Sequence, residues 1–100
     1  MSEVKATTKT TESNNQGFFM GQNIPNPFDN QTVISYQLPN GTTTAEIAVF
    51  DMVGKPVKSY YTSSSQKEIT IKSSDIGRGL FIYSLVVNGQ ELITKRMIVK

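Results

Sequence analysis

The chain has 100 residues, with ten Lys and Arg against eight Asp and Glu and a formal net charge of +2 at pH 7. It contains neither Cys nor His, which excludes disulfides, thiol and imidazole catalysis and nearly every zinc site. Its largest basic cluster is Lys95-Arg96, far from the basic stripe that nucleic-acid binding requires. A chain of this length forms at most one small domain.

The N-terminal segment is strongly polar. Residues 1–16 contain only three apolar side chains, those of Met1, Val4 and Ala6. Such a segment cannot bury enough surface to offset the entropy lost on ordering, so residues 1–20 are predicted to be a polar linker or tail ahead of a domain at residues 21–100. The chain begins without the apolar h-region of a secretory signal, and no apolar run approaches the about 20 residues that span a bilayer.

The first shaped element is the segment Gln22-Asn23-Ile24-Pro25-Asn26-Pro27-Phe28. Each Pro lacks an N–H donor and restricts the residue before it to extended geometry, so the segment cannot lie in a helix interior or a central strand. We therefore expect a rigid turn that ends in one aromatic anchor, Phe28.

Alternating hydrophobicity predicts strands from residue 32 onward. The stretch 32–38 ends in a turn at 39–41 and is followed by strands at 45–51 and 57–62, which are expected to form a hairpin around Gly54. The side chains expected on the buried faces of the first two strands are Ile34, Tyr36, Leu38, Ile47 and Val49.

The next strands follow at residues 68–72 and 80–87. The first alternates cleanly, with Ile69 and Ile71 facing inward, and a longer turn at 73–79 leads into the second. Residues 80–87 are apolar on both faces, which is typical of a central strand that is covered on both sides.

A two-residue hairpin of type I′ is predicted at Asn88-Gly89, because Asn tolerates and Gly favours the positive φ that both central positions need. It joins the strand 80–87 to a last strand at 92–99. The continuous apolar run Met97-Ile98-Val99 indicates that the last strand is either covered on both faces or shifted in register by a bulge.

These elements predict an all-β fold. No window shows helical periodicity, and short strands separated by turns at regular spacing are typical of an immunoglobulin-like β-sandwich of about seven antiparallel strands with Greek-key connections. The chain has no Trp and no Cys pair, so it is not an antibody-type domain.

The sequence offers no catalytic constellation. The carboxylates of Glu46, Asp51, Glu68, Asp75 and Glu91 are scattered over strand edges and turns, and no two of them form an acid–base motif. Asp29 lies beside two Asn residues, but short polar side chains of this kind are usually turn formers, and a calcium loop needs several carboxylates within about a dozen residues. We therefore expect no enzyme, no metal and no cofactor.

Three blocks of the chain resemble one protein family when they are taken in order. The first is Gln22 to Phe28 followed by the strand 32–38. The second runs from Ile47 to Val57 as an alternating strand, an aromatic residue with Asp51, and Gly54. The third runs from Gly79 through the hairpin to basic residues and a closing Lys. At this spacing, residues 21–100 resemble the type A C-terminal sorting domains of the type IX (Por) secretion system. The residues of the expected sorting motif are Gln22, Asn23, Pro25, Asn26, Pro27, Phe28, Asp51, Gly54, Gly79, Asn88, Gly89, Lys95, Arg96 and Lys100.

The resemblance implies a secretion signal and a route. An attached cargo protein, whose end would lie in residues 1–20, crosses the inner membrane by a separate signal. The folded domain is then recognised in the periplasm and passed through the outer-membrane translocon. A surface sortase-like peptidase removes the domain and anchors the cargo. The domain would thus be found in the periplasm in transit and then at the cell surface or outside the cell, with no nucleic acid and no small-molecule substrate as partner.

A second interpretation is an accessory β-sandwich that binds carbohydrate or spaces a neighbouring catalytic domain. Sugar sites usually present exposed aromatic rings, and the candidates are Tyr60 and Tyr61, followed by Phe18 and Phe19. Adjacent side chains in a strand face opposite sides, so only one of the two Tyr residues can lie on a given face. The absence of Trp argues against a large stacking platform.

Overall fold

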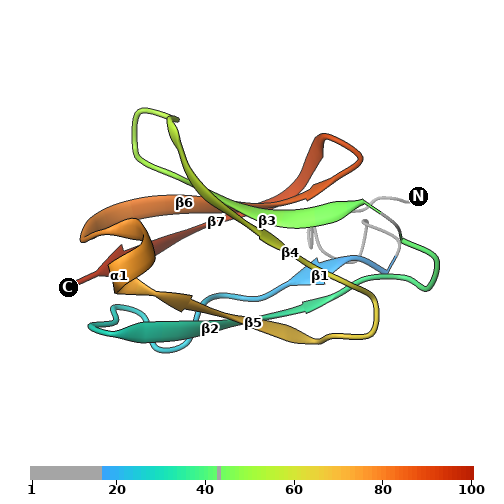
Figure 1. Ribbon diagram of the computed structural model, residues 1–100, viewed down its shortest axis with the longest axis horizontal. Coiled ribbons are helices and arrows are strands. Elements are labelled where there is room, and N and C mark those ends of the chain that lie inside the picture. The colour runs from blue at the N-terminus through green and yellow to red at the C-terminus, as the bar shows by residue number, and fades with distance from the viewer. Residues whose placement is uncertain (1–16, 43) are drawn as a thin grey trace, which may run out of the picture.

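The computed structural model describes residues 17–42 and 44–100, which form a sandwich of two antiparallel sheets (Figure 1). Seven strands and one short helix follow in chain order: β1 (Phe19–Met20), β2 (Gln31–Gln37), β3 (Ala45–Phe50), β4 (Pro56–Tyr61), β5 (Glu68–Lys72), α1 (Ser73–Ile76), β6 (Gly79–Val87) and β7 (Gln90–Val99). The predicted all-β, immunoglobulin-like sandwich is confirmed.

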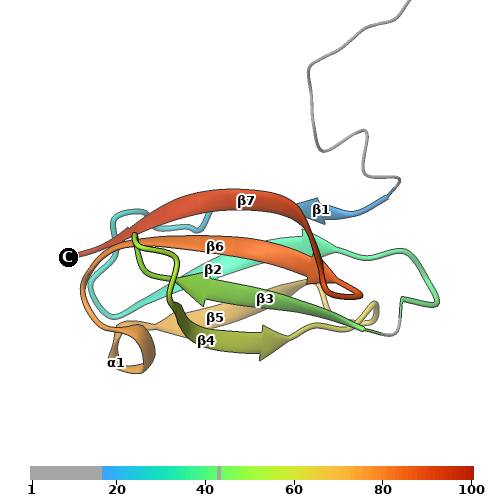
Figure 2. The same ribbon diagram turned by 90° about the horizontal axis from the view of Figure 1, so that it is seen from above.

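The strand order is β1-β2-β5 in the three-stranded sheet and β4-β3-β6-β7 in the four-stranded sheet. The neighbours β2–β5 and β3–β6 are not consecutive in the chain, because the chain crosses between the sheets after β2, β4 and β5, as in a Greek key. Figure 2 shows β7 and β1 on one side of the sandwich and β4 and β5 on the opposite side.

The hydrophobic core lies between the two sheets and contains the side chains that alternation predicted. Ile69 is the exception, because it is only half-buried on the edge strand β5, whereas Ile71 is fully buried. The largest side chains that are almost wholly shielded from solvent are Tyr83, Phe28 and Met20. Burying a side chain of this size contributes about 1.5–3 kcal/mol, so these three residues anchor the packing.

The outer face of the four-stranded sheet is open to solvent, which corrects one expectation. Leu80 and Ile98 are cross-strand partners on that face and are 40% and 43% exposed. The strand β6 is central by strand order, but no second layer of the described residues lies over its outer face, where Ser84 is shielded by hydrogen-bonded neighbours on β7. In β7, Met97 and Val99 point inward while Ile98 points outward. The register shift lies earlier in the same strand, because among the described residues the pairs Leu85–Ile93 and Val86–Glu91 leave Leu92 without a partner in the ladder.

Two short elements differ from the sequence pattern. The turn predicted at residues 73–79 begins with the helix α1, whose four residues are too few to show a period of 3.6. The sheet begins at Phe19, before the predicted domain boundary at residue 21, because Phe19–Met20 pair with β2 and the Met20 side chain is fully buried. Residues 1–16 of the predicted linker lie outside the described residues.

The β6–β7 hairpin gives a first testable prediction. Asn88 and Gly89 have φ values of 53° and 81°, as the type I′ turn requires. A Cβ at residue 89 would meet no atom within 4 Å, so the cost of a side chain there is conformational. Changing Gly89→Val should lower the free energy of unfolding by about 1–3 kcal/mol, and Gly89→Asn should cost less. Thermal and urea unfolding measure both changes, and equal stability of the two variants would contradict the prediction.

Candidate functional site

The segment Gln22–Phe28 lies along the outer edge of β7, which is the last strand of its sheet. Phe28 donates its backbone N–H to the carbonyl of Ile98 (3.1 Å), and its own carbonyl accepts the N–H of Lys100 (2.8 Å). The contact is a parallel bridge between Phe28 and Val99. The segment therefore acts as a short fifth strand against the end of β7.

Two side chains of the same segment extend this cover. The Nε2 group of Gln22 donates to the carbonyl of Arg96 (2.6 Å), and Oδ1 of Asn26 accepts the N–H of Ile98 (2.9 Å). Edge strands with free N–H and C=O groups invite pairing with other chains. The predicted motif residues thus close the edge of β7 from the carbonyl of Arg96 to the N–H of Lys100.

A buried polar network fixes the segment to the interior. The hydroxyl of Tyr83 donates to the carbonyl of Gly21 (3.0 Å) and accepts the backbone N–H of Asn23 (2.8 Å). The amide of Asn23 donates to the carbonyl of Pro25 and to Oγ1 of Thr32, both at 3.1 Å, and Thr32 donates to the same carbonyl at 2.7 Å. Because Asn23, Thr32 and Tyr83 are at most 1% exposed, the network satisfies polar groups that would otherwise be costly to bury.

The prolines and Phe28 play the roles that the sequence predicted. The bonds before Pro25 and Pro27 are cis, and the chain bends so that the Phe28 side chain enters the core, where it is 1% exposed. The carbonyl of Pro25 serves as the common acceptor of the buried network. The backbone of the segment is thus bonded to the edge of β7, and the Phe28 ring anchors the segment in the core.

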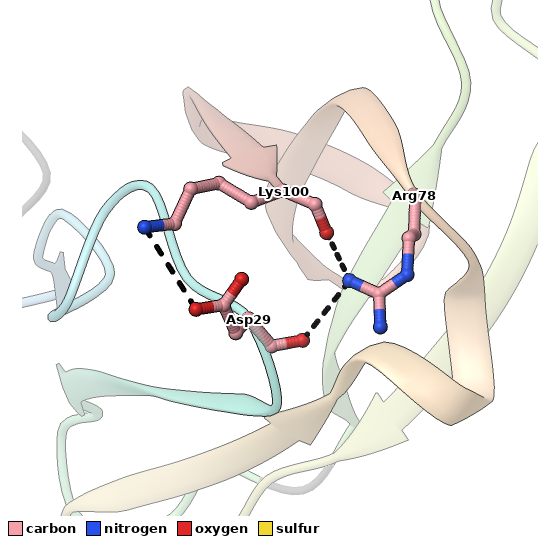
Figure 3. A network of polar contacts seen from close by, with 3 residues as sticks. All are labelled: Asp29, Arg78 and Lys100. Carbon is pink, nitrogen blue, oxygen red and sulfur yellow. Dashed lines mark hydrogen bonds and ion pairs between the residues drawn. The ribbon is translucent and has the colours of Figure 1, made fainter.

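A second cluster holds the end of β7 (Figure 3). Arg78 donates from one guanidinium nitrogen to the carbonyl of Lys100 and to the carbonyl of Asp29. The ammonium of Lys100 lies 3.8 Å from the carboxylate of Asp29, and both side chains are more than half exposed, so this ion pair contributes little stability. Gly79, a predicted motif residue, follows Arg78 with a φ of 122° and turns the chain into β6.

The other predicted motif residues lie apart from this site. Asp51 and Gly54 form the β3–β4 turn, in which the Asp51 carboxylate accepts the backbone N–H groups of Val53 (3.0 Å) and Lys55 (2.9 Å). Asn88 and Gly89 form the tip of the β6–β7 hairpin, at the far end of the sheet (Figure 1). These residues shape turns and do not contact the Gln22–Phe28 segment.

Tyr83, Thr32 and Arg78 were missing from the predicted motif. Tyr83 is 60 residues from Asn23 along the chain, and Arg78 is 22 residues from Lys100, so no local pattern joins them. A signal did exist for Thr32, since a hydroxyl residue at an inward position of a strand needs a buried hydrogen-bond partner.

The titratable groups of the site are few. Burial raises the pKa of the Tyr83 hydroxyl from its usual 10.0 to about 12, against a smaller opposing effect of the Asn23 N–H, so this group stays neutral at physiological pH. Within residues 17–42 and 44–100, no three acidic, His or Cys side chains gather at one place. The same residues form no helix with the length and apolarity to cross a membrane.

The comparisons with known proteins decide the family. The family model described as "Secretion system C-terminal sorting domain" matches residues 23–100. The chain belongs to this family. The match covers the Gln22–Phe28 segment from Asn23 onward, both sheets from β2 and the end of β7. No curated protein and no solved structure matches the chain. Membership in this family implies export to the cell surface or the extracellular space, in association with the type IX secretion system and an upstream cargo.

The Tyr83 hydroxyl gives a prediction on pH. Its pKa is higher in the folded than in the unfolded chain, so the folded state holds the proton more tightly and stability is complete below about pH 10. As the pH rises from 10 to about 12, the free energy of unfolding should fall by about 2–3 kcal/mol. Tyr60, whose pKa burial and Asp75 also raise to about 12, should add to this loss. Urea unfolding between pH 7 and 12 measures it.

Two Tyr→Phe variants separate the contribution of the Tyr83 hydroxyl from that of other tyrosines. Tyr83→Phe loses both hydrogen bonds of the hydroxyl and should be about 1–3 kcal/mol less stable at pH 7, with a shallower fall above pH 10. Tyr61→Phe is the control, because that ring is 90% exposed and its hydroxyl is not needed for folding. A Tyr83→Phe protein as stable as the wild type would show that the network does not hold the segment.

Proposed function

We propose that this domain is a passive address label that directs an attached cargo across the outer membrane by the type IX secretion system. The observation that carries the proposal is the family match over residues 23–100, together with a C-terminal strand whose edge is covered in one part and open in another. Domains of this family are not catalytic. We propose the same of this chain, with its fold serving only to present a surface.

The surface that we propose for recognition is the β6–β7 hairpin with the open part of the β7 edge. Thr94 and Arg96 face Ser84 and Ile82 across the ladder, and the alternation that directs the backbone of Ile98 outward does the same for both. Among the described residues, the N–H and C=O of Thr94 and the N–H of Arg96 have no partner. A receptor strand would add there and would stop where Gln22 and Asn26 cover the edge.

We place the domain in the periplasm before it passes the outer-membrane translocon, and at the cell surface afterwards. A sortase-like peptidase then cuts between the cargo and the domain. Supporting this order, the recognition edge belongs to the folded sandwich, so folding must precede recognition. The folded sandwich also holds the end of β7, because Arg78 donates to the carbonyl of Lys100.

The first export experiment tests strand addition directly. The chain is fused behind a periplasmic reporter in a host with the secretion system. Proline at position 94 removes the outward N–H of Thr94 without breaking the β6–β7 ladder. Thr94→Pro also loses the hydrogen bond between Thr94 Oγ1 and the buried Ser84 hydroxyl (2.9 Å), so its stability is compared with that of Thr94→Val, which loses the same bond but keeps the N–H. We expect the two variants to unfold at similar temperatures and Thr94→Pro to secrete at least about tenfold less reporter than Thr94→Val, a loss equivalent to about 1.4 kcal/mol of binding.

Ser59→Pro on the opposite edge strand, β4, is the matched control and should export normally. Deletion of residues 91–100 should leave the reporter in the periplasm, although it also removes buried core side chains. Normal secretion of a folded Thr94→Pro protein would rule out strand addition at this edge. Normal secretion of the deletion would remove the hairpin from the signal altogether.

The cut site gives a further prediction. The cut was expected upstream of Gln22, and the pairing of Phe19–Met20 with β2 moves the accessible backbone to the N-terminal side of Phe19, because a peptidase needs an extended, unpaired strand. Mass spectrometry of the domain released by cells should therefore give an N-terminus at or before Phe19. Met20→Asp, which places a charge in the core, should instead yield heterogeneous ends. A homogeneous cut after Phe28 would contradict the proposal.

A further inference from the structure

The outer face of the four-stranded sheet carries a trough. One hollow of about 440 Å³ lies next to a second of about 350 Å³. Glu46, Val86 and Gly89 line both, so the two hollows are continuous. The loops of the β3–β4 and β6–β7 hairpins rise above this face at its two ends (Figure 1). Ligand sites commonly enclose about 300–1,000 Å³, so the trough has the size of a binding site.

Tyr61 stands at one wall of the larger hollow. Its ring is 90% exposed, although it lies in β4 directly opposite Glu46 of β3. Its neighbour Tyr60 faces the other way and packs against the core, as alternation along a strand requires. The packing of the fold therefore uses Tyr60 and leaves the face of Tyr61 free.

The polar groups around Tyr61 are also unused by the fold. No described residue forms a hydrogen bond or an ion pair with the carboxylate of Glu46. The Oγ1 atom of Thr62 is buried at the hollow and has no hydrogen-bond partner. Thr44 adds an exposed hydroxyl residue.

From this arrangement we infer that the hollow beside Tyr61 binds a pyranose ring of a neutral glycan. The C–H face of the sugar packs on the Tyr61 ring, whose π-face is electronegative. Its hydroxyl groups donate to the carboxylate of Glu46 and exchange hydrogen bonds with the exposed hydroxyl group of Thr44. A second ring fits in the adjoining hollow toward Phe50. The carboxylates of Glu46 and Glu91 outnumber Lys58 in the lining and disfavour acidic sugars, so the ligand class that we infer is neutral hexoses and N-acetylhexosamines.

A sugar fits these observations better than a protein partner. The lining combines one exposed ring with carboxylates and hydroxyl groups, whereas the centre of a protein interface is depleted of charge. The hollow shares Val86 and Gly89 with the hairpin that we propose for recognition, but Tyr61 and Glu46 lie on β4 and β3, away from the edge of β7 (Figure 1). Sugar binding is measured on the chain alone and strand addition by secretion, so the two tests do not depend on each other. Failure of one proposal therefore leaves the other standing.

The test is an NMR titration of the full ¹⁵N-labelled chain with glucose, galactose, mannose and N-acetylglucosamine, each added separately. Shallow sites with one aromatic ring bind in the millimolar range, so the sugars are raised to about 50 mM. We expect at least one of the four sugars to produce saturable shifts at the backbone amides of Glu46, Tyr61 and Gly89. The amides of β7 beyond Arg96 should not move.

Three variants make the result specific. Tyr61→Ala should weaken binding at least about tenfold, while Tyr61→Phe keeps the ring and should bind within about threefold of the wild type. Val53→Ala is the control, because that side chain is 88% exposed on the other hairpin tip. The inference is overturned if none of the four sugars gives saturable shifts, or if Tyr61→Ala binds like the wild type. It is also overturned if the amide signal of Tyr61 shifts with protein concentration and not with sugar, because the ring would then take part in self-association.

Discussion

The hydroxyl of Tyr83 is the contact on which the rest of this domain depends. It joins β6 to Gly21 and Asn23, and Asn23 in turn reaches Thr32 on β2. One network therefore links the four-stranded sheet, the three-stranded sheet and the segment that enters the domain. Since a buried donor or acceptor that loses its partner costs about 1–3 kcal/mol, removing any member weakens all three parts together.

The Gln22–Phe28 segment covers part of the edge of the last strand, which in a β-sandwich is otherwise exposed. Backbone and side-chain groups of Gln22, Asn26 and Phe28 pair with the final residues of β7. The cover stops at the carbonyl of Arg96, so the earlier part of the strand keeps an open edge. This division limits where any other strand can pair with the sandwich.

Much of the fold could be predicted from local patterns. Alternation placed Ile34, Ile47 and Ile71 in the core, and the type I′ turn at Asn88-Gly89 has the predicted backbone angles. The Pro-rich segment was predicted as a rigid turn anchored by Phe28, and Phe28 is buried. Each of these features depends on neighbours within a few residues, for which the period of side chains and the φ preferences of Asn and Gly are sufficient.

The remaining features depend on contacts between distant parts of the chain. The pairing of Phe28 with Val99, and of Tyr83 with Asn23, requires knowing which strands lie at the edges, which alternation does not reveal. The apolar outer face of β6 was read as covered, because sequence alone does not show whether a second layer exists. The role in export that the family resemblance predicted stays a prediction for every motif residue, including Asp51, Gly54 and the hairpin residues Asn88 and Gly89.

The parallel bridge between Phe28 and Val99 has a mechanical consequence. A pulling force applied to the chain ahead of Gly17 is carried by β1 and the Gln22–Phe28 segment before any other element. Because that segment also covers the end of β7, tension on the cargo and exposure of the C-terminal edge are coupled through the same few hydrogen bonds. A force large enough to peel residues 19–28 from the sandwich would expose the N–H and C=O of Ile98, which Asn26 and Phe28 otherwise cover. Tension on the N-terminal side of the domain would thus open the edge of β7 near its C-terminal end.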